Sequence, residues 1–300
     1  MKNVLLTGYS GFLGKYIYSF LEKQGVEVIS IGRQKQNHII ADLSNSTLLI
    51  GQAFDSIIHA AGKAHSVPKT EAEKQDFFYV NAKGTSNLLK GLENSGIPKS
   101  FVFISSVAVY GKESGILIKE SENLSAKDPY GQSKIQAEKL IQTWCEKHNV
   151  ICTILRLPLI AGPNPPGNLG SMIKGIQKGY YFNIEGGRAK KSIVLAEDIA
   201  RIIPKVTEIG GIFNLTDGYH PSLKELSSVI AQQLNKKTPG NIPGTLAKSF
   251  AIIGDMLGKR APINTVKLKK ITSDLTFDDS KARKLLGWNP SPVLEGFKIS

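Results

Sequence analysis

The sequence predicts an α/β protein built on a doubly wound parallel sheet, with a smaller C-terminal domain. Short apolar runs alternate with longer segments of helical spacing through the first half of the chain. A glycine-rich turn stands between the first run and the first helical segment, and the alternation ends in a Pro- and Gly-rich stretch at 158–168. We therefore expect a nucleotide-binding domain over residues 1–165, rejoined by about 189–216, and a second domain over 166–300.

The amino-acid composition and charge exclude several classes of protein. The 300 residues are 41% hydrophobic, and no apolar run reaches the roughly 18–20 residues that span a bilayer, so we expect no membrane insertion and, with a strand beginning almost at once, no signal peptide. The net charge of +13 suits anionic partners, but the lysines are scattered, which argues against nucleic acid. The only cysteines, Cys145 and Cys152, make neither a disulfide framework nor a metal site, and indicate a reducing cytoplasm.

The first strand is the apolar run Val4 to Leu6, and the glycine-rich turn follows it. Gly8 permits a tight turn, Gly11 lets the backbone approach a pyrophosphate, and Gly14 lets the next helix lie close to the strand. Unpaired N–H groups at the helix start would then bind the anion. This is the Rossmann-type corner, and the residues expected to contact a dinucleotide are Gly8, Ser10, Gly11, Phe12, Leu13 and Gly14. The alternative is a turn without a ligand.

The second strand, 26–31, bears on the choice of cofactor because it ends in Gly32-Arg33. An acid here would bind the ribose hydroxyls of NAD, whereas an Arg accommodates the extra phosphate of NADP. We therefore favour NADP(H) over NAD(H), the alternative being that Arg33 is only a loop cation. Asp42 and Leu43 follow a third short strand at 39–41; Asp42 would lie near the adenine or close an Asx turn.

The fourth strand, 56–62, ends in small residues that would let a flat cofactor lie against it: His59, Ala60, Ala61 and Gly62. We expect the His59 side chain to be structural, and Lys63 and His65 to face the mouth of the pocket. A long helical stretch at 71–92 carries Asn81, which would hold backbone or place a water.

The candidate catalytic residues follow the fifth strand, 101–104. Ser106 comes at its carboxyl end, and Tyr130 and Lys134 stand one turn apart in a helix that Pro129 begins. An ammonium beside a phenol lowers the phenol pKa from about 10. Ser106 would hold a substrate oxygen and Tyr130 would transfer a proton while a nicotinamide transfers hydride. The alternative is a surface Tyr–Lys pair, which is common at this spacing.

The rest of the chain shows a sixth strand at 150–157, helices at 170–178, 223–234, 247–257 and 280–286, and a strand at 193–195 that leads into a helix. Taken together, the motifs resemble the extended short-chain dehydrogenases/reductases of the nucleotide-sugar epimerase, dehydratase and reductase group. The resemblance covers nearly the whole chain and rests on the segments 7–14, 59–62, 81–85, 104–111, 129–134, 156–163 and 279–288.

The resemblance implies that Ser106, Tyr130 and Lys134 are catalytic and that Ile104 and Leu157 join the cofactor contacts. It implies a UDP-linked sugar bound by the second domain. The substrate contacts expected are Lys63, Ser106, Tyr130, Asn168, Lys191 and Lys270, with Lys191 standing where relatives often carry Arg. It also implies a homodimer that pairs the 71–92 and 129–147 helices.

Three functions remain open. Leu159 replaces an Asn that many 4-epimerases carry, and 271–275 is similar to reductases of UDP-4-keto-6-deoxy-hexosamines, which favours a 4-keto reductase of bacterial surface polysaccharide synthesis. The alternative is a UDP-hexose 4-epimerase with tightly bound NAD. A further alternative is a non-catalytic, NADP-binding regulator. A dehydratase is disfavoured because Val107-Ala108, and no carboxylates, follow Ser106.

Overall fold

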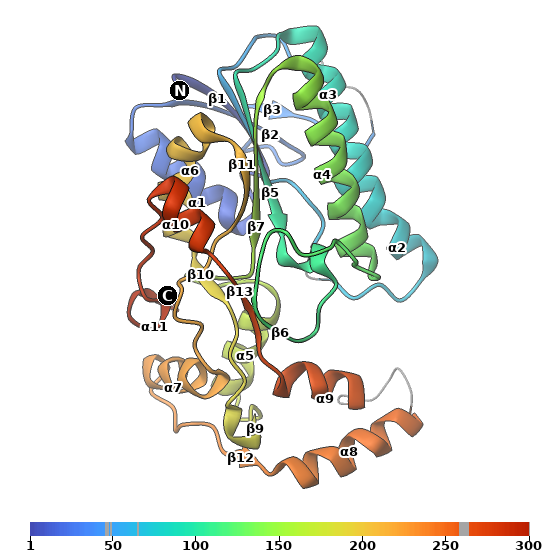
Figure 1. Ribbon diagram of the computed structural model, residues 1–300, viewed down its shortest axis with the longest axis vertical. Helices are drawn as coiled ribbons and strands as arrows, with labels where there is room; N and C mark the ends of the chain where they lie inside the picture. Colours follow the sequence, from blue (N-terminus) through green and yellow to red (C-terminus); the bar gives the residue numbers. More distant parts are fainter. Residues whose placement is uncertain (46–47, 49, 65, 258–263, 300) are drawn as a thin grey trace.

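The computed structural model describes residues 1–45, 48, 50–64, 66–257 and 264–299. Its centre is a parallel sheet of seven strands in the order β11-β7-β5-β4-β1-β2-β3 (Figure 1). This order confirms the predicted doubly wound α/β fold. The strands are β1 (Asn3–Thr7), β2 (Glu27–Gly32), β3 (Ile39–Ile40), β4 (Ser56–His59), β5 (Ser100–Ser106), β7 (Ile151–Leu157) and β11 (Gly211–Asn214).

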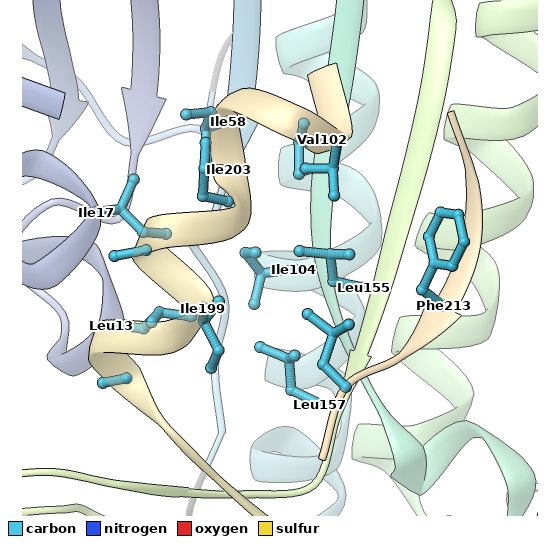
Figure 2. Packing of buried hydrophobic residues seen from close by; sticks show 14 of the residues in the cluster. Leu13, Ile17, Ile58, Val102, Ile104, Leu155, Leu157, Ile199, Ile203 and Phe213 are labelled. Carbon is cyan, nitrogen blue, oxygen red and sulfur yellow. The ribbon is translucent and has the colours of Figure 1, made fainter. Parts of the chain in front are cut away.

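Helices cover both faces of the sheet. One face carries α1 (Phe12–Lys23), α6 (Ala196–Ile209) and α10 (Ser280–Leu286), and the other carries α2 (Glu71–Phe78), α3 (Gly84–Ser95) and α4 (Pro129–His148) (Figure 1). In β5, Val102 and Ile104 enter the first face's cluster, seen in Figure 2, whereas Phe101 and Phe103 enter the other. Because successive strand side chains point to opposite faces, an unbroken apolar run is what a strand covered on both sides requires.

Short elements form the rest of the chain. They are the pairs β6 (Gly115–Ile118) with β13 (Leu275–Phe277), β8 (Leu159–Ala161) with β10 (Ile193–Leu195) and β9 (Asn183–Ile184) with β12 (Asn241–Ile242), the 3-10 turns at Val107–Tyr110 and Glu185–Gly187, and helices α5 (Gly167–Gln177), α7 (Leu223–Gln233), α8 (Gly244–Leu257), α9 (Thr265–Thr272) and α11 (Val293–Gly296). The predicted helices are present with shifted ends. Most of the strands in these pairs have too few residues for a periodic pattern.

The chain returns to the seven-stranded sheet near its end. Ala282, Leu286 and Trp288 belong to the same buried cluster as the residues labelled in Figure 2, so α10 lies against α6 and β11. Within the described part of the chain, no helix is long and apolar enough to cross a membrane.

Candidate active site

The glycine turn lies where the strand order reverses, between β1 and β4. Gly8 has φ +78°, and a Cβ there would lie 2.6 Å from the backbone nitrogen of Ala61. A Cβ on Gly14 would lie 2.0 Å from the Gly8 carbonyl oxygen. Both contacts require glycine and seat α1 directly on the turn. Gly11 is the N-cap of α1 and offers no side-chain cap, so the first N–H groups of the helix point to the end of the sheet where ligands of this fold bind.

The His59 ring is held in one tautomer by a chain of hydrogen bonds beneath the site. Thr7 Oγ1 accepts from Ala61 N at 3.0 Å and lies 2.7 Å from His59 Nδ1. Thr85 Oγ1 donates to Asn81 O at 2.6 Å, so it accepts from His59 Nε2 at 2.9 Å. Nε2 therefore carries the proton and Nδ1 accepts from Thr7. Burial, with a smaller effect of Lys134, lowers the His59 pKa to about 3, so the ring is neutral and acts structurally.

Asn81 ties the loop after β4 to helix α4. Its Oδ1 accepts from Lys63 N at 2.7 Å, while its Nδ2 donates to Lys63 O at 3.0 Å and to Ser133 Oγ at 2.8 Å. The residue sits in a π-helical turn, Tyr79–Lys83, that joins α2 to α3. Such turns re-aim a side chain that a regular helix would misplace. Asn81 was expected either to hold backbone or to place a water, and these bonds show that it holds the backbone of Lys63.

Tyr130 and Ser106 come together at the carboxyl end of β5. Asp128 caps α4 by accepting from Gly131 N at 2.9 Å, which sets Tyr130 in the first turn. Burial raises the Tyr130 pKa above its usual value of 10.0, and a hydrogen bond with the Ser106 side chain only partly offsets this. The expectation of a lowered phenol pKa is therefore wrong, and Tyr130 is a protonated phenol at neutral pH.

The Lys134 ammonium bonds to a backbone carbonyl and is not among the groups that shift the Tyr130 pKa. Nζ donates to Ile104 O at 2.9 Å and lies 4.6 Å from the centre of the Phe103 ring. The side chain is 5% exposed, and burial lowers its pKa to about 8, against the opposing effect of Glu138. Gly62 lies close by, since a Cβ there would be 3.2 Å from Lys134 Nζ.

A buried ionic network behind these residues was not foreseen from the sequence. Arg156 donates to Glu138 through Nε at 3.2 Å and Nη2 at 2.8 Å, and Ser105 Oγ donates to Glu138 at 2.5 Å. Arg156 Nη1 also donates to the Tyr110 hydroxyl at 3.1 Å, which in turn donates to Asn214 at 2.7 Å. The network links α4, β5, β7 and β11. A Glu one turn beyond Lys134 is the only signal that the sequence offers for it.

Arg33 and Asp42 lie at the ends of β2 and β3. Asp42 accepts from Ser44 N at 3.0 Å and from Ser44 Oγ at 2.6 Å, so it closes an Asx turn. Burial raises the Asp42 pKa, but the Ser44 hydrogen bonds and then the Arg33 charge outweigh it, so the pKa is lowered. Arg33 is exposed and forms no ion pair with any residue that the structure describes.

The candidate substrate residues have varied surroundings. Lys63 pairs with Asp76 at 2.9 Å, and Lys191 donates to Lys270 O and Ser273 O, capping the C-terminus of α9. A helix leaves its last carbonyls unpaired, and here Lys191 bonds to them. The cation that was expected to contact phosphate therefore caps a helix. Lys270 and Asn168 are exposed, Asn168 in the first turn of α5. Leu157 is buried, and His65 lies outside the described residues.

Over the described ranges, no group of His, Cys, Asp or Glu could bind a metal ion. The glycine turn at the start of α1, the exposed Gly62 and the charged Lys134 suit an elongated anion that carries a planar ring.

Comparisons with known proteins agree with this geometry. The family model described as NAD dependent epimerase/dehydratase family matches residues 4–215. A UDP-glucose 4-epimerase of Vibrio cholerae is 29% identical over 317 residues, covering 99% of this chain and 94% of its own. An N-acetyl-α-D-glucosaminyl-diphospho-ditrans,octacis-undecaprenol 4-epimerase of Escherichia coli O157:H7 is 28% identical over 303 residues, covering 93% of this chain and 88% of its own.

Solved structures show the same fold. A UDP-glucose 4-epimerase of Thermotoga maritima with UDP-glucose superposes with a TM-score of 0.77 at 21% identity, covering 98% of this chain and 96% of its own. RMD from Pseudomonas aeruginosa, complexed with NADPH, superposes with a TM-score of 0.74 at 20% identity, covering 98% of this chain and 94% of its own.

Proposed function

The chain belongs to the NAD-dependent epimerase/dehydratase family, and from this premise we propose that it reduces a 4-keto group on a UDP-linked hexose or hexosamine with NADPH. In bacteria this reaction supplies sugars for surface polysaccharides. The bound dinucleotide supplies the hydride. The residues that would hold it are the glycine turn, Ala60 to Gly62, Lys134 and Arg33.

Tyr130 is assigned as the donor of the proton in this reaction. Because burial keeps its phenol protonated, Tyr130 is suited to give a proton to the C4 oxygen as that oxygen gains charge. Ser106, whose side chain bonds to the same phenol, would hold the ketone oxygen beside it. Lys134, charged below pH about 8, would favour the phenolate that remains after transfer and would hold the ribose. Exchange of Tyr130 for Phe should abolish turnover and spare dinucleotide binding. If the protein were a regulator without catalysis, this exchange would change neither property.

The observation that carries the preference for reduction is the end of β2, where Gly32 and Arg33 stand in place of an acid. Arg33 is exposed, so an added phosphate at the end of β2 would meet a cation, although this cation also acts on the Asp42 carboxylate. NADPH is the dinucleotide suited to net reduction.

Arg33→Ala tests this directly. A charge-assisted hydrogen bond contributes about 1.5–3 kcal/mol, so NADPH affinity should fall about 10- to 100-fold while NADH affinity stays nearly unchanged. Lys23→Ala, which removes an exposed cation at the far end of α1, is the matched control and should change neither. Equal losses for both dinucleotides would remove Arg33 from phosphate recognition.

A 4-epimerase with tightly bound NAD is the second candidate, and the names of the relatives from V. cholerae and E. coli favour it. The same three residues would serve, with Tyr130 first accepting the proton of the C4 hydroxyl. Incubation with UDP-glucose or UDP-N-acetylglucosamine, with no added cofactor, separates the two. Interconversion of the C4 epimers would favour this candidate.

Assembly and location are further proposals that rest on the family. We propose a cytoplasmic homodimer in which α2, α3 and α4 of two copies pair. Leu140, on α4, and Tyr79, in the π-helical turn between α2 and α3, are 38% and 48% exposed. Light scattering of the purified protein tests the dimer, and Leu140→Glu should dissociate it.

A further inference from the structure

Helix α8 differs from an ordinary surface helix in which side chains it buries and which it exposes. The side chains that face α9 are small, since Ala247, Ala251 and Gly254 are its buried residues. Large apolar residues face outward instead: Leu246, Phe250, Ile252, Ile253, Met256 and Leu257 are between 47% and 85% exposed. Burying such side chains would release about 1.5–3 kcal/mol each, so their exposure indicates a surface that is covered in use.

The outward residues form one continuous stripe. Leu246, Phe250, Ile253 and Leu257 follow the spacing i, i+4, i+7, i+11, which keeps them on one side of a helix, and Met256 widens that side. In Figure 1, α8 lies at the tip of the C-terminal part, farthest from the nucleotide-binding sheet. We call the residues Leu246, Phe250, Ile253, Met256 and Leu257 the α8 stripe. The stripe is therefore free to meet a flat partner without obstructing the candidate active site.

The chain segment that carries the α8 stripe has a strongly one-sided charge. Between residues 236 and 270, the described residues include six lysines and one acid, Asp255. Lys248 is on α8 itself and Lys269 is on the neighbouring α9, and both are exposed. A second copy of this chain would bring like charges together across the stripe, which is unfavourable. An anionic surface with an apolar interior would satisfy both the lysines and the stripe.

We propose that the α8 stripe docks the protein on the surface of an anionic lipid bilayer. At 14 residues, α8 is too short to span the hydrocarbon core, which takes about 20. A helix of this kind lies in the interface, with its apolar side among the lipid chains and its lysines at the headgroups. The inference is independent of which C4 reaction the protein performs, since neither the α8 stripe nor the two tested lysines, Lys248 and Lys269, are assigned to catalysis or to ligand binding.

Flotation of the full-length protein with vesicles tests the proposal. Protein should float with phosphatidylcholine vesicles that contain phosphatidylglycerol and stay behind with pure phosphatidylcholine, and salt should weaken the binding. Replacing Phe250 and Ile253 together by Gln should lower partitioning by about tenfold per residue. Lys248→Glu with Lys269→Glu should also lower it, by about fivefold or more per lysine, and reduce the salt dependence.

A matched control is Ile116→Gln, which removes an apolar residue 72% exposed on β6 and should leave flotation unchanged. Failure of the wild-type protein to float with the anionic vesicles would overturn the proposal, as would undiminished flotation of the Phe250/Ile253 variant. Light scattering, which measures the oligomeric state, completes the test. An oligomer that this variant dissociates, with no vesicle binding by the wild type, would assign the stripe to a second copy instead.

Discussion

Replacement of Glu138 by Gln should destabilise the protein and reach the candidate active site through Lys134. Glu138 is 1% exposed and accepts from Arg156 twice and from Ser105 once. Gln keeps the volume and part of the hydrogen bonding but removes the charge. The guanidinium of Arg156, itself 2% exposed, is then left without its counter-ion.

The magnitude follows from that burial. Breaking a buried ion pair by neutralising one partner costs about 3–5 kcal/mol, and Gln retains some hydrogen bonds, so we expect a loss near the lower end. This is a large share of the roughly 5–15 kcal/mol that stabilises a typical domain. Glu138 also raises the Lys134 pKa against the effect of burial, so its loss should move that pKa further below about 8.

Urea denaturation at neutral pH measures the free energy of unfolding of both proteins. Glu93→Gln is the matched control, because Glu93 also accepts two hydrogen bonds, from Trp144 Nε1 at 3.1 Å and His148 Nε2 at 3.2 Å, but is 38% exposed. That change should cost about 0–1 kcal/mol. A loss for Glu138→Gln no greater than the control's would contradict the assignment of this network as buried and charged.

Three further results follow from the site. Gly14→Ala should lower the free energy of unfolding, measured by urea denaturation, by about 1–3 kcal/mol and weaken dinucleotide binding, because the new Cβ would lie 2.0 Å from the Gly8 carbonyl oxygen. The control Gly51→Ala, whose Cβ would have no atom within 4 Å, should be nearly neutral. Asn81→Ala should lower stability by about 2 kcal/mol and reduce kcat, since it frees the loop after β4; an unchanged kcat would make Asn81 purely structural. Dinucleotide affinity, measured by calorimetry, should fall as pH rises through about 8, where Lys134 loses its proton, and Lys134→Arg should flatten that profile. Burial has lowered this pKa from 10.5, so the protonated side chain costs stability below pH about 8 and the cost vanishes towards 10.5.

The sequence predicts those parts of the site that local geometry determines. Gly8 and Gly14 could be assigned because a strand, a turn and a helix follow one another directly. The close contacts of Gly14 are with its chain neighbours Gly8 and Tyr9, whereas the close contact of Gly8 with Ala61 comes from a distant part of the chain. The parallel direction of the strands follows from the alternation of apolar runs and helices, since parallel strands need crossovers. Asn81 could be placed on a helix, but its π-helical turn leaves no pattern in the sequence.

What the sequence does not predict depends on partners that are distant along the chain. The Glu138–Arg156 pair joins α4 to β7, and Thr7 and Thr85 fix the His59 ring from two different elements. The pKa of the Tyr130 phenol is raised and not lowered, because burial, which no local pattern reports, exceeds the lowering effect of the Ser106 hydrogen bond.

The identity and tightness of the dinucleotide test the proposed reaction most directly. The purified protein would be denatured and any released nicotinamide nucleotide identified, and the empty protein would be titrated with NADPH, NADP, NADH and NAD. We predict an empty site that prefers NADPH, with Arg33→Ala abolishing the preference. Stoichiometric NAD carried through purification would contradict the reductase, make Arg33 a loop cation, and leave the 4-epimerase as the better account of this site.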